Sequence, residues 1–305
     1  MKIQFLNGGL ANQAFQYIFT KFYEWTFPGQ IMYMDDSYFA INTVHNGYEL
    51  EKVFGIKPHF LSECFKPDVW EYILMERRAG RSIPQILSEY GVKMYMITES
   101  ETYKHFNPFD GETVCIPCNK YMPEILTVPE DVYYHGYWIN KNWMEPYKEY
   151  FWKEFTFPAI EDDKNKQYLE KILASHSVAV HVRRGDYKDV GILMETSRYR
   201  EMIEQLHNNL EFDENLESDI KKWNAFIFSD DIEWCKENYR EMGLDVFGDV
   251  IYVEGNVDGK NYIDMQLMSQ CEGMIMSNSA FCYLAALLNV RRKFVVNPTE
   301  RELWW

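Results

Sequence analysis

The sequence has few basic residues for its size. Its 305 residues include 31 lysines and arginines against 47 aspartates and glutamates, which gives a formal net charge of −16 at pH 7. Nucleic acids and anionic membrane surfaces bind proteins through basic patches. The charge balance therefore argues against both as partners. It leaves room for a small phosphorylated ligand, because such a ligand needs only a few local cations.

Several ligand-binding motifs are missing as well. The chain has no G-x-G-x-x-G and no G-x-x-x-x-G-K-[ST] sequence, so a dinucleotide fingerprint and a P-loop are unsupported. It has no D-x-D pair, which many sugar-nucleotide enzymes use to hold a metal ion on the diphosphate. Cys115 and Cys118 form a lone C-x-x-C without a second pair or histidines at ligand spacing. The sequence therefore predicts no metal site and no cofactor.

Long apolar runs are absent too. No run approaches the length of a membrane span. The first residues, MKIQFLNGG, lack the pattern of a secretion signal. We therefore expect a cytoplasmic protein with reduced cysteines and no transmembrane segment. This expectation argues against an integrin-binding role for Arg184-Gly185-Asp186, since that role requires an exposed extracellular loop.

The N-terminal pattern is typical of an α/β domain. Residues 2–8, KIQFLNG, predict a buried strand that runs into glycines, and residues 11–25 place aromatic and aliphatic side chains at helical spacing. A strand, a glycine turn and a helix open an α/β domain. A proline followed by acidic and polar residues at 155–165 indicates a hinge. Because 305 residues suit two domains, we predict one over 1–158 and another over 159–305.

Strands and helices alternate clearly after the hinge. This alternation predicts a parallel, doubly wound sheet, whose ligands bind at the carboxyl ends of the strands. The conspicuous polar clusters of this half lie at such strand ends, which indicates a binding site. The predicted strands cover 177–182, 223–230, 250–255, 273–278 and 293–298, with helices over 162–175, 196–210 and 280–289 among those between them. The polar clusters are 183–184, 229–231 and 277–279.

The segment HVRRGDY places two arginines directly after a strand. Arg183 and Arg184 have guanidinium groups that match phosphate oxygens two hydrogen bonds at a time. Gly185 lets the chain turn tightly after them. The alternative is an ordinary surface ion pair between an arginine and Asp186.

Three further positions each have two interpretations. Ser277, Asn278 and Ser279 precede a helix whose first N–H groups bind phosphate, or Ser279 is simply its N-cap. Asp264 lies in the first turn of a helix, where a carboxylate suits the helix dipole or accepts hydrogen bonds from the Watson–Crick edge of guanine. The segment NGGLANQ contains Asn12 and Gln13. These two residues either belong to a tight turn or point into an interdomain cleft.

Four motifs together resemble the bacterial α-1,2-fucosyltransferases of glycosyltransferase family 11. They are GGLANQAFQY, HVRRGDY, FSDD and DMQLMSQCEGMIMSNSAF, and they span nearly the whole chain in the family's order. The sequence departs from the family at Ala11, where a glycine is usual. It also departs at Gly273, where a histidine near the donor pocket is usual.

The resemblance implies a GT-B-like fold with two Rossmann-like α/β domains that face a cleft. The domain over 1–158 would be on the acceptor side, and the domain over 159–305 would bind GDP-L-fucose. The implied reaction transfers L-fucose with inversion to the 2-hydroxyl of a galactose-terminated glycan, without a metal ion. Carried over by position, Arg183 would hold the diphosphate, His181 and Asp264 would lie near the guanosine, and Asn12 would come from the acceptor side.

The remaining roles follow from the same assignment. The donor-binding set also contains Arg184, Asp230 and the serine-rich turn of 277–279. Asp186 is the first candidate for the general base, with Glu195 and Asp36 as weaker ones. Two other functions stay open, a fucosyltransferase that forms another linkage and a non-catalytic GDP-sugar-binding protein. The aromatic segments 38–48 and 133–143 either form the acceptor surface or pack in the interior.

Overall fold

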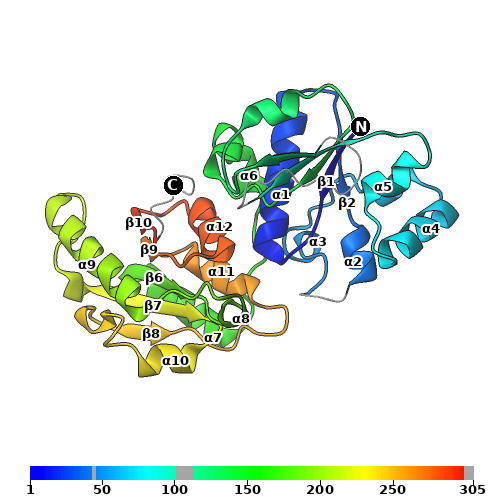
Figure 1. Cartoon of the computed structure of the whole chain (residues 1–305). Coiled ribbons are helices and arrows are strands. Elements are labelled where there is room, and N and C mark those ends of the chain that lie inside the picture. Colours follow the sequence, from blue (N-terminus) through cyan, green and yellow to red (C-terminus); the bar gives the residue numbers. More distant parts are fainter. Residues whose placement is uncertain (43–45, 101–112, 299–305) are drawn as a thin grey trace. The chain divides into compact units, whose positions relative to one another are not determined.

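The chain folds into two compact α/β units that meet in sequence between Thr156 and Phe157. The predicted boundary lies two residues further along the chain. The computed structural model describes residues 1–42, 46–100 and 113–298. Each unit has its own parallel sheet and its own helices (Figure 1). The predicted α/β fold class, with one Rossmann-like parallel sheet in each of two units, is confirmed. The cleft between the domains stays a prediction.

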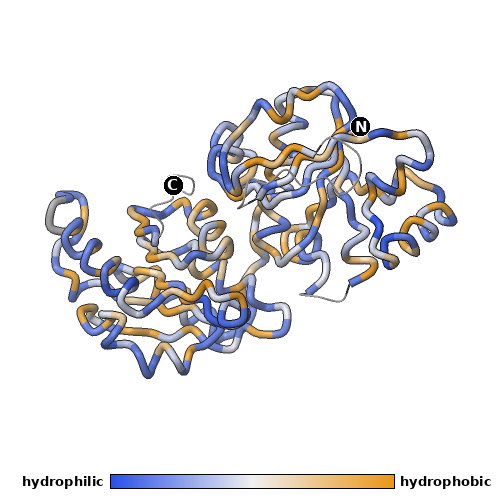
Figure 2. The backbone as a smooth tube through the Cα atoms, in the orientation of Figure 1, coloured by the Kyte–Doolittle hydropathy of each residue, from blue (hydrophilic) through white to orange (hydrophobic). Residues whose placement is uncertain are grey.

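Unit 1 is built on a five-stranded parallel sheet in the order β2-β1-β5-β3-β4. The strand that comes last in the chain, β5, pairs with both β1 and β3 and so occupies the centre. The first three residues of β5 are buried and the last is exposed. Hydrophobic and hydrophilic residues are interspersed along the backbone of both units (Figure 2). The strands are β1 (Lys2–Phe5), β2 (Met32–Asp35), β3 (Tyr95–Glu99), β4 (Thr113–Ile116) and β5 (Val132–His135).

The first helix of unit 1 confirms the pattern that predicted it. Phe15, Ile18 and Phe19 have no exposed surface, and Phe22 is nearly buried, because their spacing places them on one helical face. The α-helices are α1 (Leu10–Thr26), α2 (Ser37–Ile41), α3 (Leu50–Phe54), α4 (Pro67–Arg78), α5 (Ile83–Ser88) and α6 (Lys148–Glu154). The 3₁₀ turns are η1 (Leu61–Cys64), η2 (Pro123–Thr127), η3 (Lys141–Trp143) and η4 (Glu145–Tyr147).

The aromatic segment 133–143 mostly packs in the interior of unit 1. Tyr134, Trp138 and Trp143 have at most 1% of their surface exposed. The ring of Phe19 stacks on Trp138 at 4.4 Å and meets Trp143 edge to face at 5.0 Å. Tyr137, in contrast, is 37% exposed. The packing interpretation therefore holds for most of this segment. Residues 43–45 of the other aromatic segment lie outside the described residues.

Unit 2 repeats the architecture with the sheet order β10-β9-β6-β7-β8, in which every pair is parallel. This confirms the predicted parallel sheet. The strands are β6 (His176–Val182), β7 (Trp223–Ser229), β8 (Val250–Tyr252), β9 (Gly273–Ile275) and β10 (Phe294–Val296). The helices are α7 (Asp163–Leu173), α8 (Tyr187–Val190), α9 (Thr196–Phe212), η5 (Ile220–Lys222), α10 (Ile232–Glu237), η6 (Leu244–Val246), α11 (Tyr262–Met268) and α12 (Ala280–Leu288).

The centre of this second sheet positions the polar clusters. β6 lies between β9 and β7, and all three run in the same direction. The segments that follow their last residues therefore leave the sheet at the same edge. Buried aliphatic side chains of these strands, such as Val178, Val180 and Ile227, form part of the hydrophobic core of unit 2.

Candidate functional site

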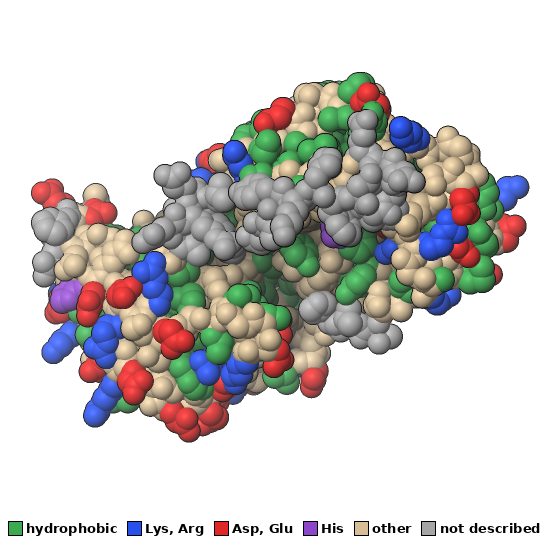
Figure 3. Space-filling view, in the orientation of Figure 1, with side chains coloured by type: hydrophobic (Ala, Val, Ile, Leu, Met, Phe, Trp, Pro, Cys, Tyr) green, Lys and Arg blue, Asp and Glu red, His purple; other side chains and the backbone are tan. Residues whose placement is uncertain are grey.

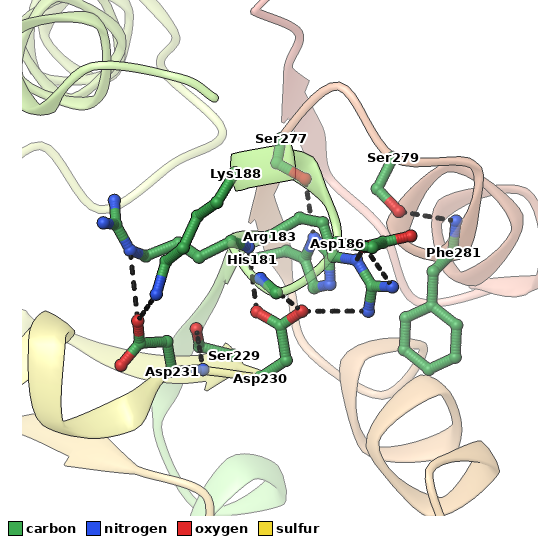
Figure 4. A network of polar contacts seen from close by, with 12 residues as sticks. His181, Arg183, Asp186, Lys188, Ser229, Asp230, Asp231, Ser277, Ser279 and Phe281 are labelled. Atoms are coloured by element: carbon green, nitrogen blue, oxygen red, sulfur yellow. Dashed lines mark hydrogen bonds and ion pairs between the residues drawn. The ribbon is translucent and has the colours of Figure 1, made fainter. Parts of the chain in front are cut away.

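Arg183 lies just beyond β6 and is held by two carboxylates (Figure 4). Its Nε and Nη2 donate to Oδ1 of Asp186 at 3.0 and 2.8 Å, and its Nη1 lies 3.1 Å from Oδ2 of Asp230. The arginine side chain remains 36% exposed, and that of Asp186 is 60% exposed. A cation with exposed partners is accessible to an anion that competes for it.

Arg184 points to different partners from its neighbour. Its guanidinium carbon lies 3.6 Å from the ring centroid of Trp234, and its Nε donates to Asp231 at 3.3 Å. Lys188 also donates to this carboxylate, at 2.8 Å. The side chain of Arg184 is only 14% exposed. Stacking and burial make it a brace between the turn and α10.

Asp230 fixes the backbone of the turn. Its Oδ1 accepts from the amide of Arg184 at 2.8 Å, and its Oδ2 accepts from the amide of Gly185 at 3.0 Å. A Cβ atom at position 185 would lie 2.7 Å from that Oδ2, so only glycine fits without a shift. Both carboxylate oxygens are therefore engaged in shaping the loop that presents Arg183.

His181 is a buried, neutral histidine at the end of β6. Its Nδ1 lies 2.8 Å from the hydroxyl of Ser277, and its ring contacts that of Phe281 at 5.7 Å. Burial, with a smaller effect of the charge on Arg183, lowers the pKa of His181 to about 3. This hydrogen bond connects the end of β6 with the turn that follows β9.

The turn of 277–279 begins α12. The hydroxyl of Ser279 accepts from the amide of Phe281 at 3.3 Å, so Ser279 is the N-cap. The side-chain amide of Asn278 donates to the carbonyl of Ile192 at 2.8 Å, and its Oδ1 is buried without a partner in the described part of the chain. The N-cap interpretation is thus correct for Ser279, and it is compatible with anion binding by the other amides.

Asp264 lies on α11, outside this cluster. Its Oδ1 accepts from Nδ2 of Asn256 at 2.6 Å. Asn256 in turn exchanges two hydrogen bonds with Asn165 at the start of α7. Burial raises the pKa of Asp264 to about 7, and the bond from Asn256 only partly offsets this rise. This carboxyl therefore keeps its proton to a much higher pH than an ordinary aspartate does.

The glycine turn of unit 1 is held by Gln13. Its Nε2 donates to the carbonyls of Gly8 and Gly47, both at 2.9 Å, and its Oε1 accepts from the amide of Glu49 at 2.8 Å. Gln13 is fully buried, so the prediction that it points into a cleft is wrong. Asn12 is partly exposed and packs over Gly8, where a Cβ would lie 2.7 Å from its Nδ2.

The structure brings together most of the predicted residues of unit 2. The cluster contains His181, Arg183, Arg184, Asp186, Asp230, Ser277, Asn278 and Ser279. In the contacts described, Asp264 has no hydrogen bond or ion pair to this cluster, and Asn12 belongs to unit 1. Asp36 accepts from the amide and hydroxyl of Ser62 in unit 1, and Glu195 is an exposed residue before α9.

Sequence reasoning missed two members of the cluster. They are Lys188, which donates to Asp231, and Trp234, whose ring stacks on Arg184. Trp234 stands three residues into the segment after Asp231, and the side chain of that aspartate accepts from the Trp234 amide. An N-cap signal followed by an aromatic residue could have indicated this position.

Packing explains why residue 273 is a glycine. It is the first residue of β9, so it lies at the amino end of a strand whose carboxyl end carries the cluster. A Cβ at this position would lie 2.0 Å from the ring of Phe294. The absence of a histidine here therefore reflects packing against β10 and leaves the cluster unchanged.

The described surface around the cluster shows no large patch of one charge on the face drawn in Figure 3. Acidic and basic side chains are interspersed over unit 2 on the face shown in Figure 3. Among the described residues, no three His, Cys, Asp or Glu side chains gather as metal ligands would. In the same part of the chain, no helix is long and apolar enough to cross a membrane.

Comparisons with known proteins identify the family of the chain. Residues 63–302 match the family described as Glycosyl transferase family 11. An α-1,2-colitosyltransferase of Escherichia coli is 29% identical over 97% of this chain and 92% of its own length. Galactoside α-(1,2)-fucosyltransferase 2 of Mus musculus is 25% identical over 45% of this chain and 38% of its own.

Solved structures with similar chains include the NodZ α-1,6-fucosyltransferase soaked with GDP-fucose. It has a TM-score of 0.48 and 13% identity, over 94% of this chain and 92% of the other. The family match covers most of the chain, including all of unit 2's polar cluster. The resemblance that the four motifs indicated is therefore confirmed, and the chain belongs to glycosyltransferase family 11.

Proposed function

We propose that this glycosyltransferase moves L-fucose from GDP-L-fucose to the 2-hydroxyl of a galactose-terminated glycan, with inversion and without a metal ion. The observation that carries the proposal is the position of Arg183. In a family 11 chain, it places an accessible guanidinium at the carboxyl end of the central strand β6, beside the turn that begins α12. The α-1,2 names of the relatives support the linkage.

The cluster suits a nucleoside diphosphate leaving group. Arg183 is paired with Asp186 and Asp230 in the absence of ligand, and phosphate oxygens would compete for the same N–H groups. The amides after Ser277 would add hydrogen bonds at a helix N-terminus. Because these donors are already fixed by the turn, they would stabilise the charge that develops on the diphosphate with little rearrangement.

The chemistry is a single displacement. The acceptor oxygen attacks the anomeric carbon from the face opposite GDP, and the bond from that carbon to the phosphate oxygen breaks with its electron pair on GDP. The acceptor hydroxyl loses its proton to a base. Arg183 would take the role that a metal ion has in enzymes with a D-x-D pair.

One observation favours GDP-colitose as an alternative sugar donor. The E. coli relative that matches almost the whole chain is named a colitosyltransferase. Colitose is L-fucose without its 3-hydroxyl, so the two sugars share their 6-methyl group and ring configuration. A pocket that hydrogen-bonds the 3-hydroxyl would prefer fucose, and one that covers this position with apolar atoms would accept colitose.

The deciding experiment incubates purified protein with GDP-fucose and lactose in the presence of a chelator. We expect GDP release and a disaccharide acceptor that carries fucose on the 2-hydroxyl of galactose. Arg183→Ala should lower kcat/KM by about 10²–10³-fold, because one fixed donor to the developing charge is lost. Arg200→Ala is the matched control, since Arg200 lies on α9 and donates only to carbonyls of 240–241 in the contacts described.

Each alternative gives its own result. Turnover with GDP-colitose and none with GDP-fucose would assign the second donor. GDP release with a product linked elsewhere would mean another linkage. GDP binding without release under any of these conditions would favour a non-catalytic protein. Full activity of Arg183→Ala would contradict the role of the arginine.

A further inference from the structure

Tyr187 is the one partly buried residue in an exposed segment beside the cluster. Residues 185–192 follow the two arginines and comprise α8 with the residues on either side of it. Every other residue of this segment is exposed. A large side chain that is covered while its neighbours are exposed packs against the protein, so its contacts indicate its role.

The ring of Tyr187 contacts Arg183. The guanidinium carbon lies 5.6 Å from the ring centroid, within the range of a cation–π interaction. The N–H groups of the same arginine are bound by Asp186 and Asp230. The ring attracts the charge of the guanidinium without an oxygen acceptor. Phosphate oxygens can therefore displace a carboxylate from the N–H groups while the ring contact persists.

The hydroxyl of Tyr187 contacts the other half of the cluster. Burial raises the pKa of Tyr187, while a hydrogen bond with the Ser279 side chain and the charge of Arg183 oppose this rise. The phenol therefore keeps its proton at neutral pH. Ser279 is the N-cap of α12, the helix whose first amides we propose to bind phosphate. One side chain thus contacts both of the elements that we assign to the diphosphate.

A second connection joins the same segment to the turn before α12. The carbonyl of Ile192 accepts from the side-chain amide of Asn278 at 2.8 Å. The amide of Ile192 in turn donates to the carbonyl of Tyr187 at 3.2 Å, across Gly191 with its φ angle of 69°. The segment is therefore closed on itself and held against that turn at two points. This arrangement fixes the backbone from which Tyr187 projects.

We propose that Tyr187 is a positioning residue of the diphosphate site, which holds Arg183 and the N-terminus of α12 together before the donor binds. This inference rests on the proposed function, because it assumes that unit 2 binds the diphosphate of a GDP-sugar. An arginine side chain loses rotamer freedom when it binds an anion, and one that is already held loses less. All of the contacts that carry the inference lie within unit 2.

Two substitutions divide the contributions of the ring and the hydroxyl. Tyr187→Phe keeps the ring against Arg183 and removes the hydroxyl, whereas Tyr187→Leu removes both. Tyr239→Phe and Tyr239→Leu are the matched controls. Tyr239 is another partly buried tyrosine of unit 2, and its ring centroid lies 5.5 Å from the guanidinium carbon of Arg240. Its hydroxyl accepts from Nε of that arginine at 2.8 Å.

The experiment compares a ligand that has phosphates with one that has none. Calorimetry measures the Kd of GDP directly and the Kd of guanosine by competition with GDP. A separate assay follows the transfer of fucose from GDP-fucose. A positioning role at the diphosphate changes the affinity for GDP and leaves that for guanosine as it is, whereas a general disturbance of unit 2 changes both.

We expect Tyr187→Phe to weaken GDP binding by about 3–10-fold, because one hydrogen bond is lost. Tyr187→Leu should weaken it by about 10–100-fold, because the cation–π contact is lost as well. The Kd of guanosine should stay the same in both, and the two Tyr239 variants should bind GDP as the wild type does.

Unchanged GDP binding in Tyr187→Leu would overturn the inference. An equal loss of affinity for GDP and guanosine would overturn it too, since the substitution would then act on unit 2 as a whole. If the expected affinities are found but no fucose is transferred, the inference stands and the proposed function fails. A wild-type protein that does not bind GDP would reject both.

Discussion

Among individual residues, Asp264 has the most informative charge state. Among the described residues its carboxyl has one hydrogen-bond partner, the side-chain amide of Asn256, and burial raises its pKa to about 7. An unfolded aspartate has a pKa near 3.9. If guanine donates two N–H bonds to the ionised carboxylate, as the sequence predicts for this position, GDP binding would release a proton. The affinity for GDP would then rise with pH through about 7.

We predict that Asp264→Asn changes the pH dependence of stability. Between about pH 4 and pH 7 the folded protein keeps a proton on Asp264 that the unfolded chain has lost, so stability falls as pH rises through this window. The amide of the variant does not titrate. Relative to wild type, the variant should gain roughly 1–3 kcal/mol in unfolding free energy between pH 5 and pH 8. Urea unfolding at both pH values measures it.

The wild-type profile alone would hide this effect. The pKa of His181 is lowered to about 3, so its contribution to stability is lost as pH falls below its unfolded value near 6.5. The two slopes have opposite signs over much of the same range. The comparison of variant with wild type isolates Asp264, and a constant difference between pH 5 and pH 8 would contradict the raised pKa.

At the scale of elements, the loop after β5 depends on one carboxylate at the end of β3. Glu99 accepts from the amides of Asn119 at 2.7 Å, Tyr137 at 2.7 Å and Trp138 at 3.1 Å. Asn119 and Trp138 have positive φ angles of 60° and 57°, which this anchoring holds in place. A Cβ at Gly136 would lie 2.8 Å from Glu99 Oε2, so the close approach requires glycine there.

We therefore expect Glu99→Gln to weaken this loop. The amide presents only one acceptor oxygen and turns its NH₂ toward a backbone N–H, so at least one of the three backbone amides loses its partner. The unfolding free energy should fall by about 2–4 kcal/mol, measured by urea unfolding. Acceptor KM should rise, whereas the affinity for GDP, measured by calorimetry, should stay the same.

The control for this variant is another glutamate of unit 1. Glu51 pairs with Lys57 at 2.8 Å on the surface, and both side chains are exposed. Glu51→Gln should change stability by less than about 1 kcal/mol. If Glu99→Gln behaves like Glu51→Gln, the carboxylate does not hold the loop.

At the scale of the whole molecule, each unit has a separate core. One buried cluster joins β6, β7 and α9 in unit 2, and another joins β1, β5 and α5 in unit 1. Separate cores allow separate cooperative unfolding. The residues that we propose to bind GDP follow strands of the unit 2 core, so GDP should stabilise that unit selectively.

We predict two transitions in scanning calorimetry, of which GDP raises one. At a GDP concentration of 100 times Kd, the stabilisation is about 2.7 kcal/mol, which corresponds to roughly 5–10 °C for a unit of this size. Arg183→Ala should reduce the shift and leave both transitions of the free protein near their original temperatures. A single transition that moves as a whole would contradict independent units.

Much of the fold could be read from local patterns. The spacing of Phe15, Ile18 and Phe22 predicted α1, and the alternation after residue 155 predicted the parallel sheet of unit 2. The strands β8, β9 and β10 are shorter than predicted. Residues such as Ser277 leave the sheet to form the site, although their apolar neighbours continue the pattern of a strand.

The sequence by itself determined the two α/β units, the family and the strand ends where polar residues gather, because periodicity and motif order are properties of neighbouring residues. Only the tertiary structure decided what each side chain does there. Arg183 and Arg184 are adjacent and identical, yet the first pairs with exposed carboxylates and the second stacks on Trp234. His181 likewise bonds to Ser277, on a segment that becomes its neighbour only when β9 pairs with β6. Partners of this kind are far apart in the chain, so no local pattern specifies them.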